Sequence, residues 1–136
     1  MTQKEKMELL NGYIQANVAP ILVEGIPTSI FKDEATILPA TCALSELNGH
    51  YEGIDFVPPI WYQEVLFKEN DPINLLVIDN LGGLSKADQM KFYELLCYRK
   101  IGVFELPANC VILLTTETMK LHETIYSLVA HIGDVL

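Results

Sequence analysis

The chain has 136 residues, half of them hydrophobic, which is the length of one domain and enough apolar material for a core of its own. Its net charge of −9, with only nine basic residues, argues against a surface that binds nucleic-acid phosphates. No apolar run approaches the roughly 18 residues of a membrane-spanning helix, and the charged N-terminal segment is not patterned like a signal peptide.

The first predicted elements are a helix and a short strand. Residues 2–16 have the period of an amphipathic helix, with Thr2 and Glu5 as a capping box. The predicted inward face carries Met7, Leu10 and Ile14. Residues 20–24 form an apolar strand that stops at Gly25.

The segment after Gly25 leaves little room for a helix. Pro39 and the β-branched pair Thr36 and Ile37 oppose a helix in residues 33–39, so we expect residues 35–42 to be extended. Residues 45–53 are predicted to be a loop or short helix with His50, a solvated histidine, at its tip.

A second helix is predicted where Pro58 and Pro59 precede an apolar segment. It spans residues 60–68, with Trp61, Val65 and Leu66 facing inward. Asn70, Asp71 and Pro72 then end the helix and turn the chain.

The central stretch, residues 73–117, consists of two apolar runs joined by a helix-patterned segment. The first run stops at Asp79, and the second spans residues 110–114. Between them, residues 87–100 have a helical pattern, and Ser85 with Asp88 caps that helix. Two such runs with a long crossover predict parallel strands in an α/β fold. The predicted inward stripe of the helix is Met90, Tyr93, Leu96 and Cys97.

The last elements are weaker. Thr115, Thr116 and Glu117 end the second strand of the central stretch. A helix is predicted at residues 123–129 and a final strand at residues 132–135.

The central stretch resembles the Walker B to sensor-1 region of AAA+ ATPases, closest to the MoxR-like branch. The matching segments are LLVIDN, ADQMKFYELLCYRK, IGVFELP and VILLTTE. Upstream, LVEGIPTSIFK is similar to a Walker A segment whose glycines and lysine are replaced, and VPPIWYQEV is similar to a segment before Walker B. The resemblance implies one domain over residues 1–136, with an N-terminal helix (1–17) and an αβ core (20–136). It further implies a P-loop NTPase fold, a three-layer sandwich with a mainly parallel sheet, a shortened first crossover helix and no lid domain.

The resemblance places a vestigial nucleotide loop at residues 25–32. The residues that correspond to a Walker A loop are Gly25, Pro27, Thr28, Ser29 and Lys32. A phosphate loop needs glycines, because its N–H groups must approach phosphate closely. Only Gly25 remains, and Lys32 comes one residue too late, with Phe31 in the lysine position.

The remaining site positions also depart from the family pattern. Asp79 corresponds to the aspartate that holds Mg²⁺, and Asn80 stands in place of the glutamate that activates water. Thr116 and Glu117 fall at the sensor-1 position, and His131 falls where an arginine finger often sits. Asp79 with Asn80 is equally consistent with a plain strand-end turn.

Arg99 is the only arginine in the sequence, whereas AAA+ machines ordinarily use several arginines in hydrolysis. It is expected to be a cation near a helix C-terminus. The changed and missing groups together predict a domain that does not hydrolyse ATP and acts as an interaction or regulatory module. Expected partners are proteins, including active AAA+ subunits, and neither nucleic acid nor membrane. No confident cofactor is predicted.

Three other interpretations remain open. In the first, the chain binds ATP or ADP weakly with Mg²⁺ and needs a partner for hydrolysis. In the second, it reuses the cleft for an unrelated small ligand. In the third, it is a folded relic without selected function. The three cysteines are odd in number and have no CxxC spacing, which predicts free thiols and a cytoplasmic location. The sequence predicts nothing about oligomeric state.

Overall fold

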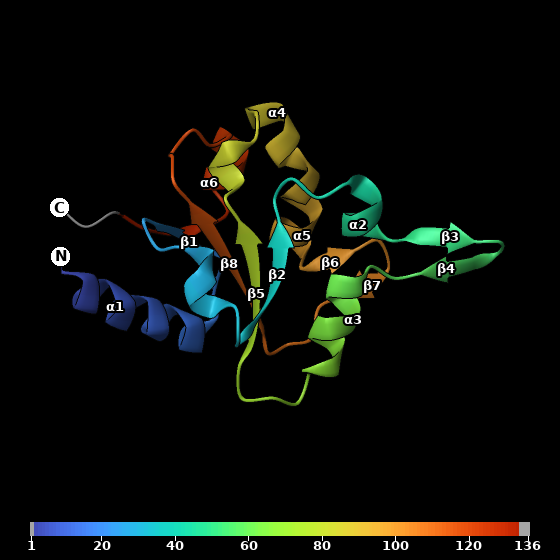
Figure 1. Ribbon diagram of the computed structural model, residues 1–136, viewed down its shortest axis with the longest axis horizontal. Coiled ribbons are helices and arrows are strands. Elements are labelled where there is room, and N and C mark those ends of the chain that lie inside the picture. Colours follow the sequence, from blue (N-terminus) through green and yellow to red (C-terminus); the bar gives the residue numbers. More distant parts are fainter. Residues whose placement is uncertain (1, 134–136) are drawn as a thin grey trace.

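The computed structural model describes residues 2–133, and its centre is a five-stranded parallel sheet (Figure 1). The strands of this sheet are β1 (Ile21–Glu24), β2 (Ala35–Pro39), β5 (Asn74–Asp79), β8 (Cys110–Thr116) and β9 (Ala130–Ile132). They lie side by side in the order β2-β5-β8-β1-β9, and every neighbouring pair is parallel. The predicted α/β class with a parallel sheet is therefore confirmed, including the parallel pairing of β5 with β8.

Helical segments lie over both faces of the sheet. The α-helices are α1 (Gln3–Ala16), α2 (Leu44–Asn48), α3 (Ile60–Phe67), α4 (Lys86–Gln89), α5 (Tyr93–Tyr98) and α6 (Glu123–Tyr126). The 3₁₀ turns are η1 (Thr28–Phe31), η2 (Leu81–Gly83) and η3 (Met90–Phe92). Helix α1 with η1 covers one face, whereas α2, α3, α5 and α6 contribute to the hydrophobic cluster on the other.

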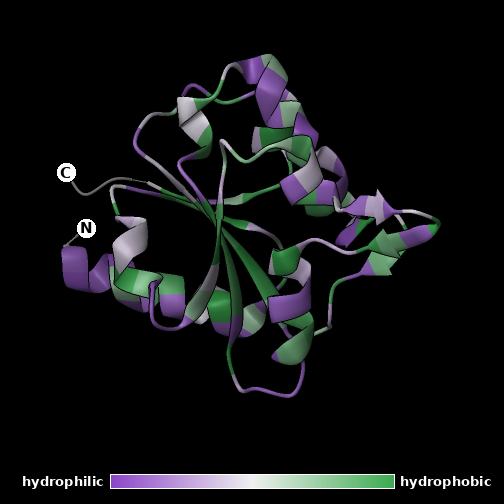
Figure 2. Ribbon diagram, turned by 45° about the vertical axis from the view of Figure 1, so that its right-hand side comes forward, coloured by the Kyte–Doolittle hydropathy of each residue, from purple (hydrophilic) through white to green (hydrophobic). Residues whose placement is uncertain are grey.

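The strands are hydrophobic on both sides because both faces are covered. Leu75 and Val77 of β5 belong to the cluster beneath α1, and Leu76 and Ile78 belong to the opposite cluster. Figure 2 shows the same arrangement, with green strands in the middle and most purple segments on the outside. The continuous apolar runs in the sequence are thus explained by burial from two directions.

The connection between β1 and β2 has no full helix, as the sequence predicts. Only the single turn η1 separates them, and β2 follows after three further residues. Strand β2 ends at Pro39 on one edge of the sheet, where it pairs with β5 alone.

The segment between β2 and β5 differs from the prediction at two places. A two-stranded antiparallel hairpin, β3 (His50–Glu52) with β4 (Asp55–Val57), projects from the body of the molecule. His50 lies at the base of this hairpin, paired with Val57, and not at a loop tip. In α3, Trp61 and Val65 are buried as predicted, but Leu66 is exposed, because its side chain falls on the outer side of the helix.

The helix predicted over residues 87–100 is interrupted. It consists of α4, η3 and α5, and the predicted buried stripe is mostly wrong: Met90, Tyr93 and Cys97 are only half-buried. The fully buried side chains here are Gln89, Phe92 and Leu95, with Leu96 nearly so. A 3₁₀ turn advances three residues per turn rather than 3.6, so η3 shifts which residues face the sheet. The small hairpin β6 (Lys100–Ile101) with β7 (Phe104–Glu105) follows α5.

The N-terminal helix agrees with the prediction, whereas the C-terminal elements differ from it by a few residues. Helix α1 begins after Thr2, whose hydroxyl accepts a hydrogen bond from the Glu5 N–H, as predicted. Helix α6 ends at Tyr126, and strand β9 starts at Ala130, two residues before its predicted start. The predicted strand residues 134–135 lie outside the described part of the chain. Within residues 2–133, no helix has both the length and the apolar character to cross a membrane.

Candidate functional site

The carboxyl ends of β1, β5 and β8 surround a cavity of about 450 Å³. Most of the sequence-predicted site residues line it, namely Gly25, Pro27, Thr28, Ser29, Asp79, Asn80, Thr116 and Glu117. Ile26 and Thr115 line it too and are additional to the prediction. The parallel sheet brings these residues together because all three strands end at the same edge. Lys32 and His131 do not line this cavity.

Hydrogen bonds among three side chains close one wall of this cavity. The Thr28 hydroxyl donates to Asp79 Oδ1 at 2.6 Å, and the Thr28 and Thr115 hydroxyl oxygens share a hydrogen bond at 2.7 Å. Thr115 also donates weakly to Asp79 Oδ1 at 3.4 Å. The Asp79 carboxylate is therefore bound directly by the loop that follows β1. Side chains alternate between the two faces of a strand, and Thr115 and Asp79 lie on the same face of the sheet. This alternation could have predicted Thr115 as a site residue.

The loop that follows β1 differs from a phosphate-binding loop in its backbone and in its core contacts. Gly25 has a φ of 73°, which glycine adopts without strain. Pro27 has no N–H to offer a ligand. Phe31, at the position where the sequence resemblance expects a Walker A lysine, is buried in the core with 5% of its surface exposed. Lys32 is exposed at the end of η1.

The turn after β5 is held against the end of β8. Asn80 adopts a left-handed conformation with a φ of 57°, which asparagine tolerates better than most residues. Its N–H donates to the Thr115 hydroxyl at 3.2 Å, and its side-chain oxygen accepts the Glu117 N–H at 3.5 Å. A Cβ on Gly82 would lie 2.4 Å from the Thr116 hydroxyl oxygen, so this approach requires glycine. Asn80 thus connects two strand ends.

The charges around the cavity are negative. Asp79 and Glu117 contribute carboxylates, and none of the described residues that line the cavity is lysine or arginine. A polyphosphate in this position would face repulsion from like charges without a compensating cation. Within residues 2–133, moreover, no three His, Cys, Asp or Glu side chains gather closely enough to hold a metal ion. A Mg²⁺ on Asp79 would therefore need further oxygen ligands outside such a cluster, such as hydroxyl groups, water or a nucleotide.

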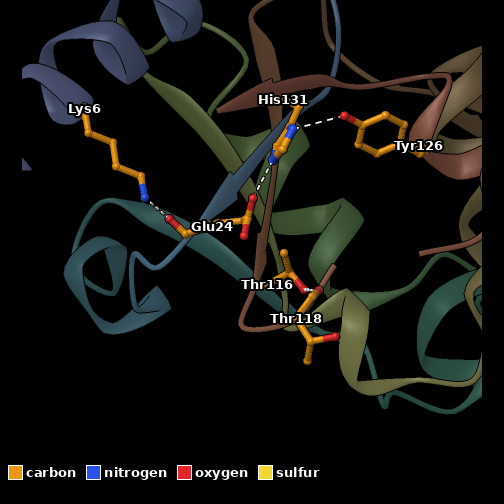
Figure 3. Close-up of polar contacts among 6 residues, drawn as sticks. All are labelled: Lys6, Glu24, Thr116, Thr118, Tyr126 and His131. Carbon is orange, nitrogen blue, oxygen red and sulfur yellow. Dashed lines mark hydrogen bonds and ion pairs between the residues drawn. The ribbon is translucent and has the colours of Figure 1, made fainter. Parts of the chain in front are cut away.

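His131 lies in β9 and is bonded within the chain on both ring nitrogens (Figure 3). Its Nε2 lies 2.7 Å from Glu24 Oε1, and its Nδ1 lies 3.1 Å from the Tyr126 hydroxyl oxygen. From the opposite side of the sheet, Lys6 of α1 donates to the Glu24 carbonyl oxygen. The side chain of Lys6 is fully buried. These contacts tie the N-terminal helix and the last strand to the end of β1.

Arg99 is bonded to backbone carbonyl groups of the chain. It follows α5 with a φ of 55°, and its guanidinium donates to the carbonyl oxygens of Pro107 and Cys110 at 3.2 and 2.7 Å. The predicted position beyond the helix C-terminus agrees with these contacts. The guanidinium thereby joins the end of α5 to the loop after β7 and to the start of β8.

The chain matches no known protein-family model, and no curated protein matches it.

Proposed function

We propose that the chain is an AAA+-like domain of the P-loop NTPase fold, related to the MoxR-like branch, that does not hydrolyse ATP and serves as an interaction or regulatory module. The sheet supports this proposal, because the ends of β1, β5 and β8 meet at one cavity, where open α/β sheets bind ligands. Helices on both faces are also what a three-layer core requires.

The hydrogen bonds on the Asp79 carboxylate are the observation that carries the proposal. In a nucleotide site, a carboxylate at this strand end helps to hold Mg²⁺ next to the phosphates. Here Asp79 Oδ1 accepts the Thr28 hydroxyl at 2.6 Å, so the loop binds the carboxylate itself. The same loop buries Phe31 in the core where a phosphate-binding lysine would extend.

The other groups that phosphoryl transfer needs are changed as well. Transfer depends on positioning and on stabilising charge at the phosphoryl group. The amide of Asn80 cannot accept a proton from water at neutral pH, Glu117 adds negative charge, and Arg99 is bonded to backbone carbonyls. His131, at the position expected for an arginine finger, is bonded to Glu24 and Tyr126 through its two ring nitrogens. Each change alone slows hydrolysis, and together they favour an inactive domain.

The proposed partners are proteins, with active AAA+ subunits or the proteins that these subunits serve as the first class to test. The acidic composition favours a protein partner over nucleic acid. We place the domain in the cytoplasm as part of the same proposal, since Cys42, Cys97 and Cys110 are free thiols and two of them are buried.

Calorimetry with Mg²⁺-ATP and Mg²⁺-ADP, with the melting temperature followed in parallel, tests the proposal. We expect no heat and no thermal shift at millimolar nucleotide. Binding to the native state would instead add about 2.7 kcal/mol to the unfolding free energy at a hundredfold excess over Kd. Asp79→Ala is the matched variant, because a heat that changes in this variant places the nucleotide in the cavity around Asp79. Site-specific heat together with ATP turnover would overturn the proposal.

Weak nucleotide binding is the second candidate. Gly25, Thr28, Ser29 and Asp79 do share one cavity, and its 450 Å³ falls within the usual range of ligand sites. Saturable heat with ADP, abolished in Asp79→Ala and without turnover, would favour it. Binding of an unrelated small ligand instead of nucleotide would favour reuse of the cavity.

A further inference from the structure

Helix α3 is hydrophobic on two opposite sides, although only one of them is covered. Trp61, Tyr62 and Val65 are buried against the sheet, whereas Ile60 and Phe67 on the outside are 75% and 90% exposed. A helix that is apolar all round is normally buried all round. Ile60, Glu64 and Phe67 are spaced four and three residues apart, so they form one outer stripe, apolar at both ends and acidic in the middle.

The outer stripe borders two adjoining hollows. A cavity of about 490 Å³ lies between the outer stripe, strand β2 and the base of the β3–β4 hairpin; Ile37, Pro39, Val57 and Pro58 give it apolar walls. A second hollow of about 460 Å³ extends along α3 to Phe67. Ile60 and Glu64 line both, so the two hollows adjoin along the outer stripe. We call the two hollows together the α3–β2 groove.

Strand β2 offers hydrogen-bonding groups along this groove. It is an edge strand, paired with β5 alone, and its sequence ATILP carries no charge. In the described part of the chain, no hydrogen bond joins the backbone of residues 35–38 to any element other than β5. Natural edge strands are usually protected by charges, bulges or a covering segment. Helix α3 packs beside β2, and Thr36 and Leu38 are nearly fully buried, so the accessible part of this edge is residues 37–39, which line the central cavity.

The charges at the groove select the kind of occupant. Glu46, Glu64 and His50 line its central cavity, and Lys68 is the single lysine or arginine among the described residues that line the two hollows. The whole chain adds a net charge of −9. Complementarity therefore favours a cationic segment with apolar side chains over an acidic one.

We propose that the α3–β2 groove binds an extended segment of a partner protein in which apolar residues alternate with lysine or arginine. The segment adds to the free edge of β2 through main-chain hydrogen bonds, its apolar side chains fill the cavity between Pro39 and Ile60, and its basic side chains face Glu46 and Glu64. This specifies the partner of the proposed interaction module and rests on that proposed function.

The test is a titration of the intact protein with a synthetic peptide amide of about eight residues, the length of an ordinary strand, in which valine and leucine alternate with lysine and arginine. Trp61, the single tryptophan, lines the groove and reports binding through its fluorescence, and calorimetry provides a second readout. We expect saturable binding. A peptide with glutamate in place of its basic residues, and one N-methylated on alternate amides, should bind at least about tenfold more weakly, a difference of 1.4 kcal/mol.

Variants locate the site. Ile60→Ser and Phe67→Ser should each weaken binding about tenfold, the factor for losing the burial of one large apolar side chain. Glu64→Lys should weaken it most at low salt. Val18→Ser, equally exposed but remote, and Glu8→Lys on α1 should bind like the wild type. All five positions are exposed, so the unfolding free energy should stay within about 0.5 kcal/mol.

Three results would overturn the groove proposal: no saturable binding, equal binding of the N-methylated peptide, or a dimer that forms through the same residues and excludes the peptide. The last would make a second copy of the chain the occupant. These results are distinct from failure of the proposed function, because nucleotide turnover is measured separately and without peptide. Turnover with intact peptide binding would overturn the pseudo-ATPase proposal alone.

Discussion

Thr28 and Phe31 show how two residues change the character of a loop. Both follow Gly25 in a segment that resembles a nucleotide loop, yet one bonds the Asp79 carboxylate and the other joins the core. Each contact ties the loop to the rest of the fold. Substitutions at these residues are therefore expected to change the unfolding free energy.

Replacing Thr28 by Val should lower the unfolding free energy by about 1 kcal/mol, because a partly buried carboxylate and the Thr115 hydroxyl lose a hydrogen-bond partner. Urea titration measures the change, with Thr28→Ser expected to retain most of the stability. Thr41→Val, at an exposed position, is the matched control. A Thr28→Val protein as stable as the wild type would show that the network contributes little.

Cys110 should make the unfolding free energy depend on pH in the alkaline range. Burial raises the pKa of its thiol from the ordinary 9.0 to about 12, against a smaller opposite effect of Arg99. The unfolded thiol ionises above pH 9.0 while the folded thiol keeps its proton, so the unfolding free energy falls as pH rises from 9.0 to about 12. The slope from this group is at most about 1.4 kcal/mol per pH unit.

Urea unfolding of the wild type and of Cys110→Ala at several pH values measures this contribution. The variant should lose stability less steeply above pH 9.0, whatever its starting stability. Parallel slopes would contradict the assignment. Alkylation of the native protein gives an independent check, since half-buried Cys97 should react before buried Cys42 and Cys110.

At the scale of elements, the interrupted helix α4–η3–α5 is held by one buried amide. Gln89 donates to the carbonyl oxygens of Leu84 and Lys120 at 3.2 and 2.8 Å and accepts the His122 N–H at 2.8 Å. These bonds join the end of α4 to Leu84 before it and to the loop after β8. They explain why a glutamine, and not one of the predicted apolar residues, faces inward.

Gln89→Met should lower the unfolding free energy by about 2 kcal/mol, because two carbonyl groups and one N–H lose their partner in a buried position. Gln15→Met, at an exposed position of α1, should change it by less than about 0.5 kcal/mol. Chemical denaturation measures both. An unchanged midpoint for Gln89→Met would mean that water replaces the amide without cost.

For the whole molecule, the parallel sheet assembles the candidate site and leaves one edge open. β5 and β8 are central and buried, and the ends of β1, β5 and β8 form the cavity around Asp79. At the sheet's edge, β2 borders the α3–β2 groove. The cavity around Asp79 and the α3–β2 groove are thus lined by different residues. Substitutions in one can therefore be made without changing a residue that lines the other.

The sequence alone determined the elements whose signals are local. The apolar runs of β5 and β8, the capping box of α1 and the prolines before α3 are fixed by neighbouring residues, and their positions were predictable. Strand polarity also made it predictable that Gly25, Asp79 and Thr116 meet at one edge. These features depend on periodicity and chain direction, which a sequence records directly.

Only the tertiary structure decided which polar side chains are hydrogen-bonded partners. The Thr28–Asp79–Thr115 bonds, the buried Gln89 and Lys6, and the pairing of His131 with Glu24 all join residues more than thirty positions apart or on different elements. The open edge of β2 and the exposed side of α3 likewise depend on what packs beside them. Burial and hydrogen bonding are properties of the assembled chain, because each depends on atoms brought close by folding rather than by sequence.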